Sequence, residues 1–203
     1  HDKIDGGPGG YHIGQGSAYV FQTSGGGYYG QVDKLTAANA AKDDTFGISV
    51  AIDGGTVVVG AFDANDYKGA AYIFHATDDL PAYSQVAMLT PSDAGRDDFF
   101  GSSVAIDGDT VVVGSARNCV YIFRTTNDGA TYPQVDKLTA PDGEIGDSFG
   151  SSVAIDDGTV VVGAKADEHD GGDGWPSRKG SVYVLSSEPP PKSRQQKDTE
   201  KEE

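Results

Sequence analysis

The residues most suited to chemistry in this sequence are two groups of acidic and amide side chains in segments that contain glycine. The first group is Asp63, Asn65 and Asp66, and the second is Asp167, Asp170 and Asp173. Carboxylate and amide oxygens are the ligands that Ca²⁺ takes in proteins, so each group predicts a calcium site, with Ca²⁺ as the cofactor. Neither group has the EF-hand spacing, because Tyr67 and Gly171 stand at the fifth ligand position. The alternative is a solvated loop whose side chains cap their own turns.

Two aromatic side chains in these segments are candidates for binding a partner. Tyr67 follows Asp66 directly, and Trp175, the sole Trp, lies between Gly174 and Pro176 in the longest loop. Aromatic residues in variable loops commonly contact a sugar or a protein. The alternative for Trp175 is that it covers the apolar face of a sheet.

The sequence predicts no catalytic site. Its four His residues do not recur at equivalent positions, and it contains no Gly-x-Ser-x-Gly, His-Glu-x-x-His or phosphate-binding motif. A Ser pair recurs at Ser102-Ser103 and Ser151-Ser152, but Ile48 replaces the first Ser in another copy. We therefore expect these to be strand residues and the chain not to be an enzyme.

The acidic segments occupy the same place in a repeated unit. Close copies of residues 100–114 occur at 46–60 and 149–163. In each copy a strand of alternating small and apolar residues leads through a turn of two or three Asp and Gly residues into a run of β-branched residues. This pattern is typical of a β-hairpin. The second strand has no polar face, which predicts an interior strand covered on both sides.

Two further strands complete the unit. An aromatic strand recurs at residues 18–21, 71–74, 120–123 and 182–185, and a more polar strand recurs at 31–36, 85–90 and 134–139. Lys34 and Lys137 lie in the polar strand, which is typical of an edge strand protected from mispairing by charge. Four strands in a unit of about 40–50 residues predict an all-β fold built from β-propeller blades of four antiparallel strands.

The strands come in groups of two, four, four and three along the chain, and this number does not close a ring. We therefore expect a partial propeller of about three blades plus flanking strands. The repeats are predicted near 46–90, 100–139 and 149–186, with 1–37 as the end of a preceding blade. Terminal repeats without polar caps expose the surfaces that stacking would bury, so we expect self-association through unpaired blade faces.

Recurring dipeptides give the unit a family resemblance. Three Phe-Gly pairs and the Gly that ends each hairpin form a common framework: Phe46, Gly47 and Gly60; Phe100, Gly101 and Gly114; Phe149, Gly150 and Gly163. This framework resembles the FG-GAP repeat, the blade unit of integrin α-subunit propellers and of many secreted proteins. The resemblance covers roughly residues 1–186 and implies an extracellular or cell-surface location and a binding role. The hairpin turn is too short for the calcium loop of the integrin-type repeat, so that metal site is not carried over.

Three acidic residues stand two positions before the Phe of each pair, at Asp44, Asp98 and Asp147. A position repeated in every blade indicates a structural role, and we expect these carboxylates to accept backbone N–H bonds. Cys119, the only Cys, is expected to be a small buried residue.

Charge and hydropathy limit the partners. The 31 acidic and 15 basic residues give a net charge of −16, which excludes nucleic acid and anionic membrane as expected partners. No apolar run is long enough to insert directly into a membrane. Residues 187–203 are rich in Pro and charge, which is typical of a disordered tail.

Two functions fit this pattern. The first is a non-catalytic extracellular or cell-surface scaffold for protein or glycan binding or adhesion, assisted by calcium. The alternative is an accessory propeller of a larger secreted hydrolase or lyase whose catalytic part lies outside this chain, or a propeller enzyme with an active site in a central funnel. The first strands read Ser-Val-Ala-Ile-Asp in all three copies, and such uniformity favours a scaffold over a catalytic funnel.

Overall fold

A computed structural model describes residues 14–23, 25–77, 82–141, 146–166 and 180–186. The described residues form thirteen strands and one short helix. Blade 1 contains β1 (Ala18–Thr23) and β2 (Tyr29–Leu35), and blade 2 contains β3 (Ser49–Asp53), β4 (Thr56–Ala61), β5 (Ala70–Ala76) and β6 (Tyr83–Leu89). Blade 3 contains β7 (Ser103–Asp107), β8 (Thr110–Ser115), β9 (Cys119–Arg124) and β10 (Gln134–Thr139). Blade 4 contains β11 (Phe149–Asp156), β12 (Thr159–Ala164) and β13 (Ser181–Ser186).

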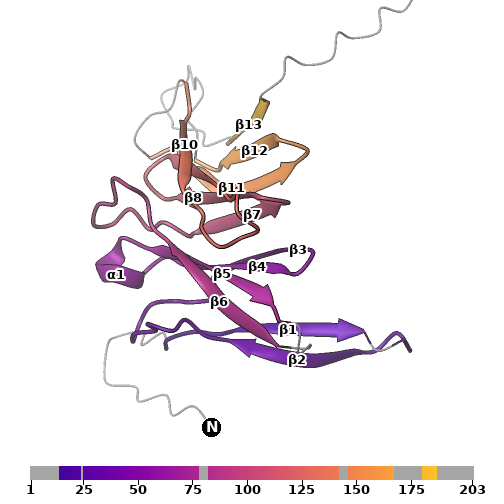
Figure 1. Cartoon of the computed structure of the whole chain (residues 1–203). Coiled ribbons are helices and arrows are strands. Elements are labelled where there is room, and N and C mark those ends of the chain that lie inside the picture. The colour runs from indigo at the N-terminus through magenta and orange to yellow at the C-terminus, as the bar shows by residue number, and fades with distance from the viewer. Residues whose placement is uncertain (1–13, 24, 78–81, 142–145, 167–179, 187–203) are drawn as a thin grey trace, which may run out of the picture.

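Each blade is an antiparallel sheet whose strands pair in chain order. The four sheets are stacked one on another, with β1–β2 at one end and β11–β13 at the other (Figure 1). The prediction of an all-β partial propeller with four-stranded blades is confirmed. The polar strands β2, β6 and β10 lie at sheet edges, as the charges within two of them indicated.

The hairpin between the first and second strands has the predicted short turn. Asp53 pairs with Thr56, and Asp107 pairs with Thr110, so two residues form each loop. Gly54 and Gly108 have φ of 53° and 51°, the positive values that primed hairpin turns require at their first central residue. These turns fix the register that brings the apolar residues of each strand to the correct face.

The Val strands lie inside the stack because both of their faces are covered. In β8, Val111 and Val113 pack toward blade 2, while Val112 packs toward blade 4, and all three are fully buried. The absence of a polar face in the sequence is thereby explained. Burial of each such side chain contributes about 1.5–3 kcal/mol before the entropy cost of ordering it.

The Phe of each Phe-Gly pair lies between two blades. Phe46, Phe100 and Phe149 are 3%, 0% and 0% exposed. Each packs edge-on or tilted against the Tyr of the third strand in its own blade, with ring centroids 5.5, 5.6 and 5.2 Å apart. Inter-blade packing is therefore the role of this residue.

Contacts between blades also account for the recurring Gly and Ser residues. The Ser49 hydroxyl donates a hydrogen bond of 2.8 Å to the carbonyl oxygen of Gly101 in the next blade. A Cβ on Gly60 would overlap both this hydroxyl and this carbonyl oxygen. The Gly that ends one hairpin and the Phe-Gly bend of the next blade are therefore parts of one contact, in which the backbones approach too closely for any side chain.

Blade 1 contains no first or second strand among the described residues, and this exposes part of blade 2. Val50 and Ile52 on β3 are each 60% exposed, whereas the equivalent Val104 and Ile106 on β7 are 8% and 9% exposed. The difference arises because β3 and β4 of blade 2 cover one face of β7. Among the described residues, no first or second strand of blade 1 covers the corresponding face of β3.

Candidate functional site

The segment after β4 carries the first predicted calcium group and differs from the predicted loop. It contains α1 (Ala64–Tyr67), a single turn in which Asn65, Asp66 and Tyr67 have φ of 55°, 64° and 64°. These values are left-handed, which Asn and Asp tolerate better than Tyr does. Ala64 is 1% exposed and anchors the turn against the blade.

Tyr67 projects from this turn into a cluster that we name the aromatic corner, formed by Phe62, Tyr67, Arg96 and Phe99. The Phe99 ring lies 5.7 Å from Phe62 and 6.3 Å from Tyr67, between ring centroids. The Arg96 guanidinium lies 5.8 Å from the centre of the Tyr67 ring. Tyr67 is 42% exposed, so the corner presents an aromatic face and a cation to solvent.

Backbone hydrogen bonds hold the corner together. The N–H groups of Phe99 and Phe100 donate to the carbonyl oxygens of Tyr67 and Lys68 at 3.3 and 3.1 Å. The turn after β4 and the linker between blades 2 and 3 are thereby joined. The corner is thus built by two segments of the chain rather than by one flexible loop.

Negative charges crowd the blade side of the turn. Burial raises the pKa of Asp63, the Thr45 hydroxyl partly offsets this, and the nearby carboxylates of Asp43 and Asp44 raise it further. One side-chain oxygen of Asp43 is buried without a hydrogen-bond partner. Desolvation and charge repulsion therefore both disfavour the ionised form of Asp63.

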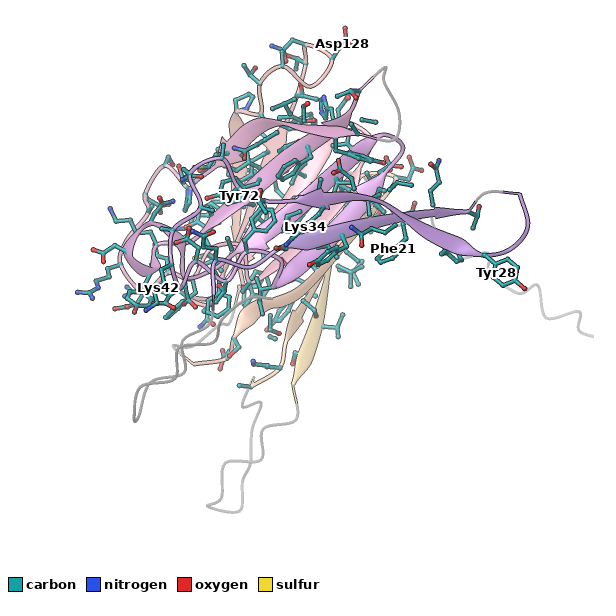
Figure 2. The ribbon with its side chains drawn as sticks, turned by 90° about the horizontal axis from the view of Figure 1, so that it is seen from below. Phe21, Tyr28, Lys34, Lys42, Tyr72 and Asp128 are labelled. Atoms are coloured by element: carbon teal, nitrogen blue, oxygen red, sulfur yellow. The ribbon has the colours of Figure 1, made fainter. Side chains whose placement is uncertain are left out.

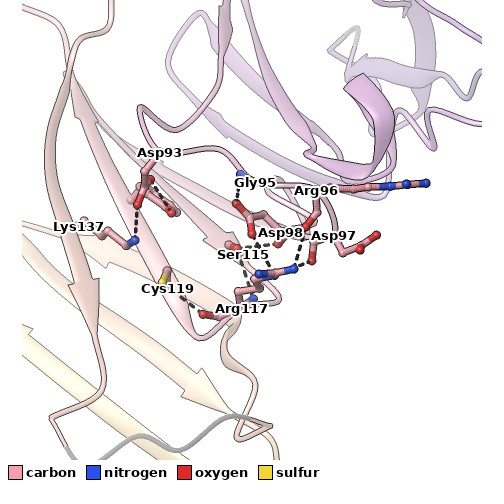
Figure 3. A network of polar contacts seen from close by, with 10 residues as sticks. Asp93, Gly95, Arg96, Asp97, Asp98, Ser115, Arg117, Cys119 and Lys137 are labelled. Carbon is pink, nitrogen blue, oxygen red and sulfur yellow. Dashed lines mark hydrogen bonds and ion pairs between the residues drawn. The ribbon is translucent and has the colours of Figure 1, made fainter.

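The equivalent place in blade 3 is occupied by a cation. Arg117 follows Gly114 at the distance at which Asp63 follows Gly60. Its guanidinium lies 3.1 Å from the Asp98 carboxylate and donates to the carbonyl oxygens of Arg96 and Asp97 at 2.8 and 3.3 Å (Figure 3). In blade 3, Arg117 thus neutralises the negative charge of the linker. In blade 2, Asp63 at the equivalent position adds a third negative charge to those of Asp43 and Asp44.

The recurring acids before the Phe-Gly pairs have the predicted structural role. Asp44 and Asp98 are each 7% exposed and accept hydrogen bonds from the N–H groups of Ala41 and Gly95, at 2.7 and 2.5 Å. Asp147 is buried as well. The carboxylates of Asp44 and Asp98 thus close their linkers where blades 2 and 3 begin.

A second polar network joins the same linker to the outer strands of blade 3 (Figure 3). Asp93 accepts hydrogen bonds from the Lys137 ammonium at 2.6 Å and from the Tyr121 hydroxyl at 3.1 Å. Lys137 lowers the pKa of Asp93, and Asp93 in turn raises the pKa of Lys137. Burial raises the pKa of Tyr121 to about 12. These shifts keep each group of the network in its ordinary charge state.

Cys119 lies beside this network and corrects the expectation of a buried thiol. It is half-buried, and its Sγ donates to the carbonyl oxygen of Arg117 at 3.3 Å. The residue is the first of β9 and follows the short connection from β8. Burial raises the pKa of the thiol, and this disfavours the reactive thiolate form.

The predicted site residues are only partly placed. Asp63, Asn65 and Asp66 share the turn of α1, whereas Asp167, Asp170, Asp173 and Trp175 lie outside the described residues, as does the predicted tail at 187–203. Within the described part of the chain, no three His, Cys, Asp or Glu side chains converge closely enough to hold a metal ion. The calcium sites therefore stay a prediction.

Sequence reasoning missed the partners of Tyr67. Arg96 and Phe99 belong to the linker before the Phe-Gly pair, and nothing in their order along the chain connects them to residue 67. A usable signal was present at Phe99, because the equivalent residue in the preceding linker is Thr45; Arg96 gave none, because its equivalent is the basic residue Lys42. Among the described residues the one helix, α1, is four residues long and thus far too short to cross a membrane.

Comparison with solved structures gives similarity at low identity. Sqt1 of Saccharomyces cerevisiae is 13% identical, with a TM-score of 0.42, over 61% of this chain and 30% of that one. A europium-containing methanol dehydrogenase is 13% identical, with a TM-score of 0.42, over 66% and 22% of the two chains. The computationally designed protein Ika4 is 13% identical, with a TM-score of 0.32, over 70% and 91%. This chain thus spans less than a third of the first two proteins.

A search among curated proteins gives no match. The model of the FG-GAP repeat matches three segments, residues 29–74, 83–133 and 132–185. Together these segments cover most of the chain, and each runs from the fourth strand of one blade through the first three strands of the next. The chain belongs to the FG-GAP repeat family.

Proposed function

We propose that this chain is a non-catalytic scaffold that binds a protein or glycan partner outside the cell, and that the aromatic corner is its contact site. The observation that carries this proposal is the exposed Tyr67 ring with Arg96 above it and Phe99 beside it. An aromatic face binds the C–H face of a sugar or an apolar side chain, and a guanidinium donates to hydroxyl or carboxylate oxygens. Exposed Tyr and Arg residues are also the types that most often dominate protein interfaces.

The absence of catalysis is part of the proposal. The inner strands of the blades are nearly identical, and their Ser and Asp side chains bind the backbone of the next blade. The large pKa shifts at Tyr121 and Lys137 have structural causes in burial and the Asp93 pair. Uniform blades with polar groups committed to packing support a scaffold that presents variable loops.

The location outside the cell, and a role in adhesion, rest on the family. FG-GAP repeats are typical of extracellular proteins. The strongly negative charge favours soluble partners that are neutral or basic and disfavours nucleic acid.

We also propose that calcium assists the turn of α1. Its support is electrostatic: Asp63 is held near Asp43 and Asp44, and a divalent cation would relieve their repulsion. Calorimetric titration of the chelator-treated chain tests this, together with melting curves, because binding to the folded state must raise the melting temperature. We expect binding heat and a thermal shift, and we expect Asp63→Ala to abolish both. Asp128→Ala is the control and should retain both, because Asp128 lies in a loop distant from Lys42 (Figure 2), the residue before Asp43. If no heat appears up to millimolar calcium, calcium is removed from the proposal.

Binding at the aromatic corner is tested with Tyr67→Ala on a glycan array and in pull-downs of secreted proteins. The matched control is Tyr28→Ala, because Tyr28 is 84% exposed at the β1–β2 turn and belongs to no cluster described above. We expect any partner found with the wild-type chain to be lost with Tyr67→Ala and kept with Tyr28→Ala. Equal binding by both variants would move the contact site elsewhere.

A further inference from the structure

The aromatic corner lies between blades 2 and 3, and both of these blades have all four strands among the described residues. The two segments that build the corner, residues 62–69 and 92–99, are described throughout. Within them, Tyr67 is the one large apolar side chain that is mostly open, at 42% exposed, while Phe62 and Phe99 are half-buried. The apolar surface that the corner offers to a ligand is therefore about the size of one aromatic ring.

The turn that carries Tyr67 is held in one conformation. The Gly69 N–H donates to the Ala64 carbonyl oxygen at 2.8 Å, and a Cβ on Gly69 would overlap the backbone of Phe100. These contacts, with the bonds from the linker N–H groups, support three consecutive left-handed residues that are costly in isolation. A ring presented on such a backbone loses little conformational entropy when a ligand binds.

The Arg96 guanidinium contacts the Tyr67 ring but takes no part in the ion pair of the linker. Its side chain is exposed and points away from the pair of Arg117 and Asp98 (Figure 3). Its backbone carbonyl oxygen, rather than its side chain, accepts the hydrogen bond from Arg117. The guanidinium N–H groups can therefore donate to a ligand oxygen while the side chain stays over the ring.

The charges beside the ring distinguish a neutral ligand from an acidic one. Three exposed charged residues flank Tyr67 and Arg96 in the chain: Asp66, Lys68 and Asp97. Together with Arg96 they make two cations and two anions, and the whole chain carries −16. The carboxylates and the net charge repel an acidic ligand. A hydroxyl both donates and accepts, so it can use both kinds of neighbour.

We propose that the aromatic corner binds a neutral pyranose sugar, whose C–H face stacks on Tyr67 and whose hydroxyls accept hydrogen bonds from Arg96. This ligand class rests on the proposed function and selects a glycan over a protein. A pyranose ring matches the area of one aromatic ring. A standard protein interface buries about 800 Å² on each side and is centred on enclosed apolar contacts, which one ring among charged side chains does not supply.

A contact of this size predicts weak binding. A single methyl glycoside should bind with a Kd of about 1 mM, as expected for a small ligand. The Kd should not change between low and high salt, because a neutral sugar carries no charge for salt to screen. A charged ligand would bind with a clear salt dependence.

Saturation-transfer NMR tests the inference with the neutral methyl glycosides of glucose, galactose and mannose, and with methyl glucuronide as the acidic probe. We expect saturation of the ring C–H protons of at least one neutral glycoside. Tyr67→Ala should weaken binding about tenfold or more, whereas Tyr67→Phe should retain it because the ring remains. Arg96→Met removes the donors and should weaken binding about fivefold. Tyr28→Ala is the matched control and should bind as the wild-type chain does, and circular dichroism verifies that each variant is folded.

Three results would overturn the sugar as ligand. The first is no saturation of any neutral glycoside at concentrations far above the expected Kd. The second is binding that Tyr67→Ala leaves intact, since the sugar would then lie elsewhere. The third is tighter, salt-sensitive binding of methyl glucuronide, since the ligand would then be acidic.

Failure of the proposed function gives a different pattern of results. If a secreted protein is captured through Tyr67 while no glycoside binds, the corner remains a contact site and only the sugar is wrong. If neither a protein nor a glycan depends on Tyr67, the contact site and the sugar both fall.

Discussion

The Ser103 hydroxyl donates a hydrogen bond of 2.7 Å to the carbonyl oxygen of Gly150, and this bond ties the first strand of blade 3 to the Phe-Gly bend of blade 4. The equivalent bond from Ser49 to Gly101 joins blades 2 and 3. Contacts between blades thus explain why these residues recur in the repeat. Substitutions at these contacts should therefore lower the stability of the stack.

Ser103→Ala should destabilise the chain by about 1–3 kcal/mol, because it leaves the Gly150 carbonyl in a buried place without its donor. Urea unfolding followed by circular dichroism measures the loss. Ser102→Ala is the matched control: this hydroxyl reaches the Gly114 carbonyl at 3.3 Å and is half-buried, so a loss below about 1 kcal/mol is expected. Equal losses would refute the importance of the inter-blade bond.

Gly114→Ala should cost more than Ser103→Ala. A Cβ at Gly114 would overlap the Gly150 carbonyl oxygen and the Ser103 hydroxyl, and the carbonyl belongs to backbone that cannot move aside easily. The double variant removes one of the two overlaps, so its loss should be smaller than the sum of the single losses. Additive losses in the same urea experiment would mean that the blades separate locally instead of clashing.

Asp63→Asn should stabilise the chain at neutral pH. The folded pKa of Asp63 is raised, so its contribution is favourable below the unfolded pKa and is lost as pH rises through the folded pKa. The advantage of Asp63→Asn over wild type should therefore be largest at neutral pH and shrink as the pH is lowered toward 4. Thermal melts at a series of pH values measure it, with Asp66→Asn in the same turn as a control for net charge. An advantage that does not change with pH would contradict the repulsion.

The pair Asp93–Lys137 should give the opposite pH dependence. Lys137 lowers the folded pKa of Asp93, so the stabilisation is present above the unfolded pKa and is lost as pH falls through the folded pKa. Both side chains are partly exposed, which limits the effect to about 1 kcal/mol or less. Lys137→Met should remove this acid-sensitive part of the stability, measured as the difference between melts near pH 7 and pH 3. No difference between variant and wild type would mean that solvent screens the pair completely.

The blades could be predicted from the sequence because every strand type occurs at least three times. The unbroken Val runs indicated interior strands, Lys34 and Lys137 indicated edges, and Asp-Gly turns indicated hairpins. The aromatic corner could not be predicted in this way. It depends on the contact between the linker at residues 92–99 and the turn after β4, which no local pattern encodes. The half-buried state of Cys119 likewise depends on how the end of β9 is covered, which strand propensity does not determine.

The replacement of Arg117 by Asp63 in the preceding repeat was visible in the sequence but had no meaning without the fold. Only the structure places both residues against the linker acids of their blades, where one neutralises them and the other adds charge. Positions that depart from the repeat are therefore those at which the blades differ in charge and in contacts.

A last departure from the repeat concerns Tyr72, whose hydroxyl is buried without a hydrogen-bond partner. Burial raises the pKa of this Tyr, and the nearby Asn39 side chain partly offsets this. In blade 3 the equivalent Tyr121 donates to Asp93, which also binds Lys137. The positions of Asp93 and Lys137 are held in blade 2 by Asn39 and Met88, which contact each other at 3.6 Å.

Asn39→Asp combined with Met88→Lys should build the blade 3 network into blade 2 and satisfy the Tyr72 hydroxyl. A gain of about 1 kcal/mol is expected from the new hydrogen bond. Met88→Lys alone should give no gain, because Asn39 offers no carboxylate for the ammonium, and Asn39→Asp alone adds a charge near Asp44. A double-mutant cycle by urea unfolding isolates the coupling of the two changes. A coupling energy near zero would show that the Tyr72 hydroxyl is too far from residue 39 to use the new acceptor, and that blade 2 tolerates the unsatisfied group for a packing reason.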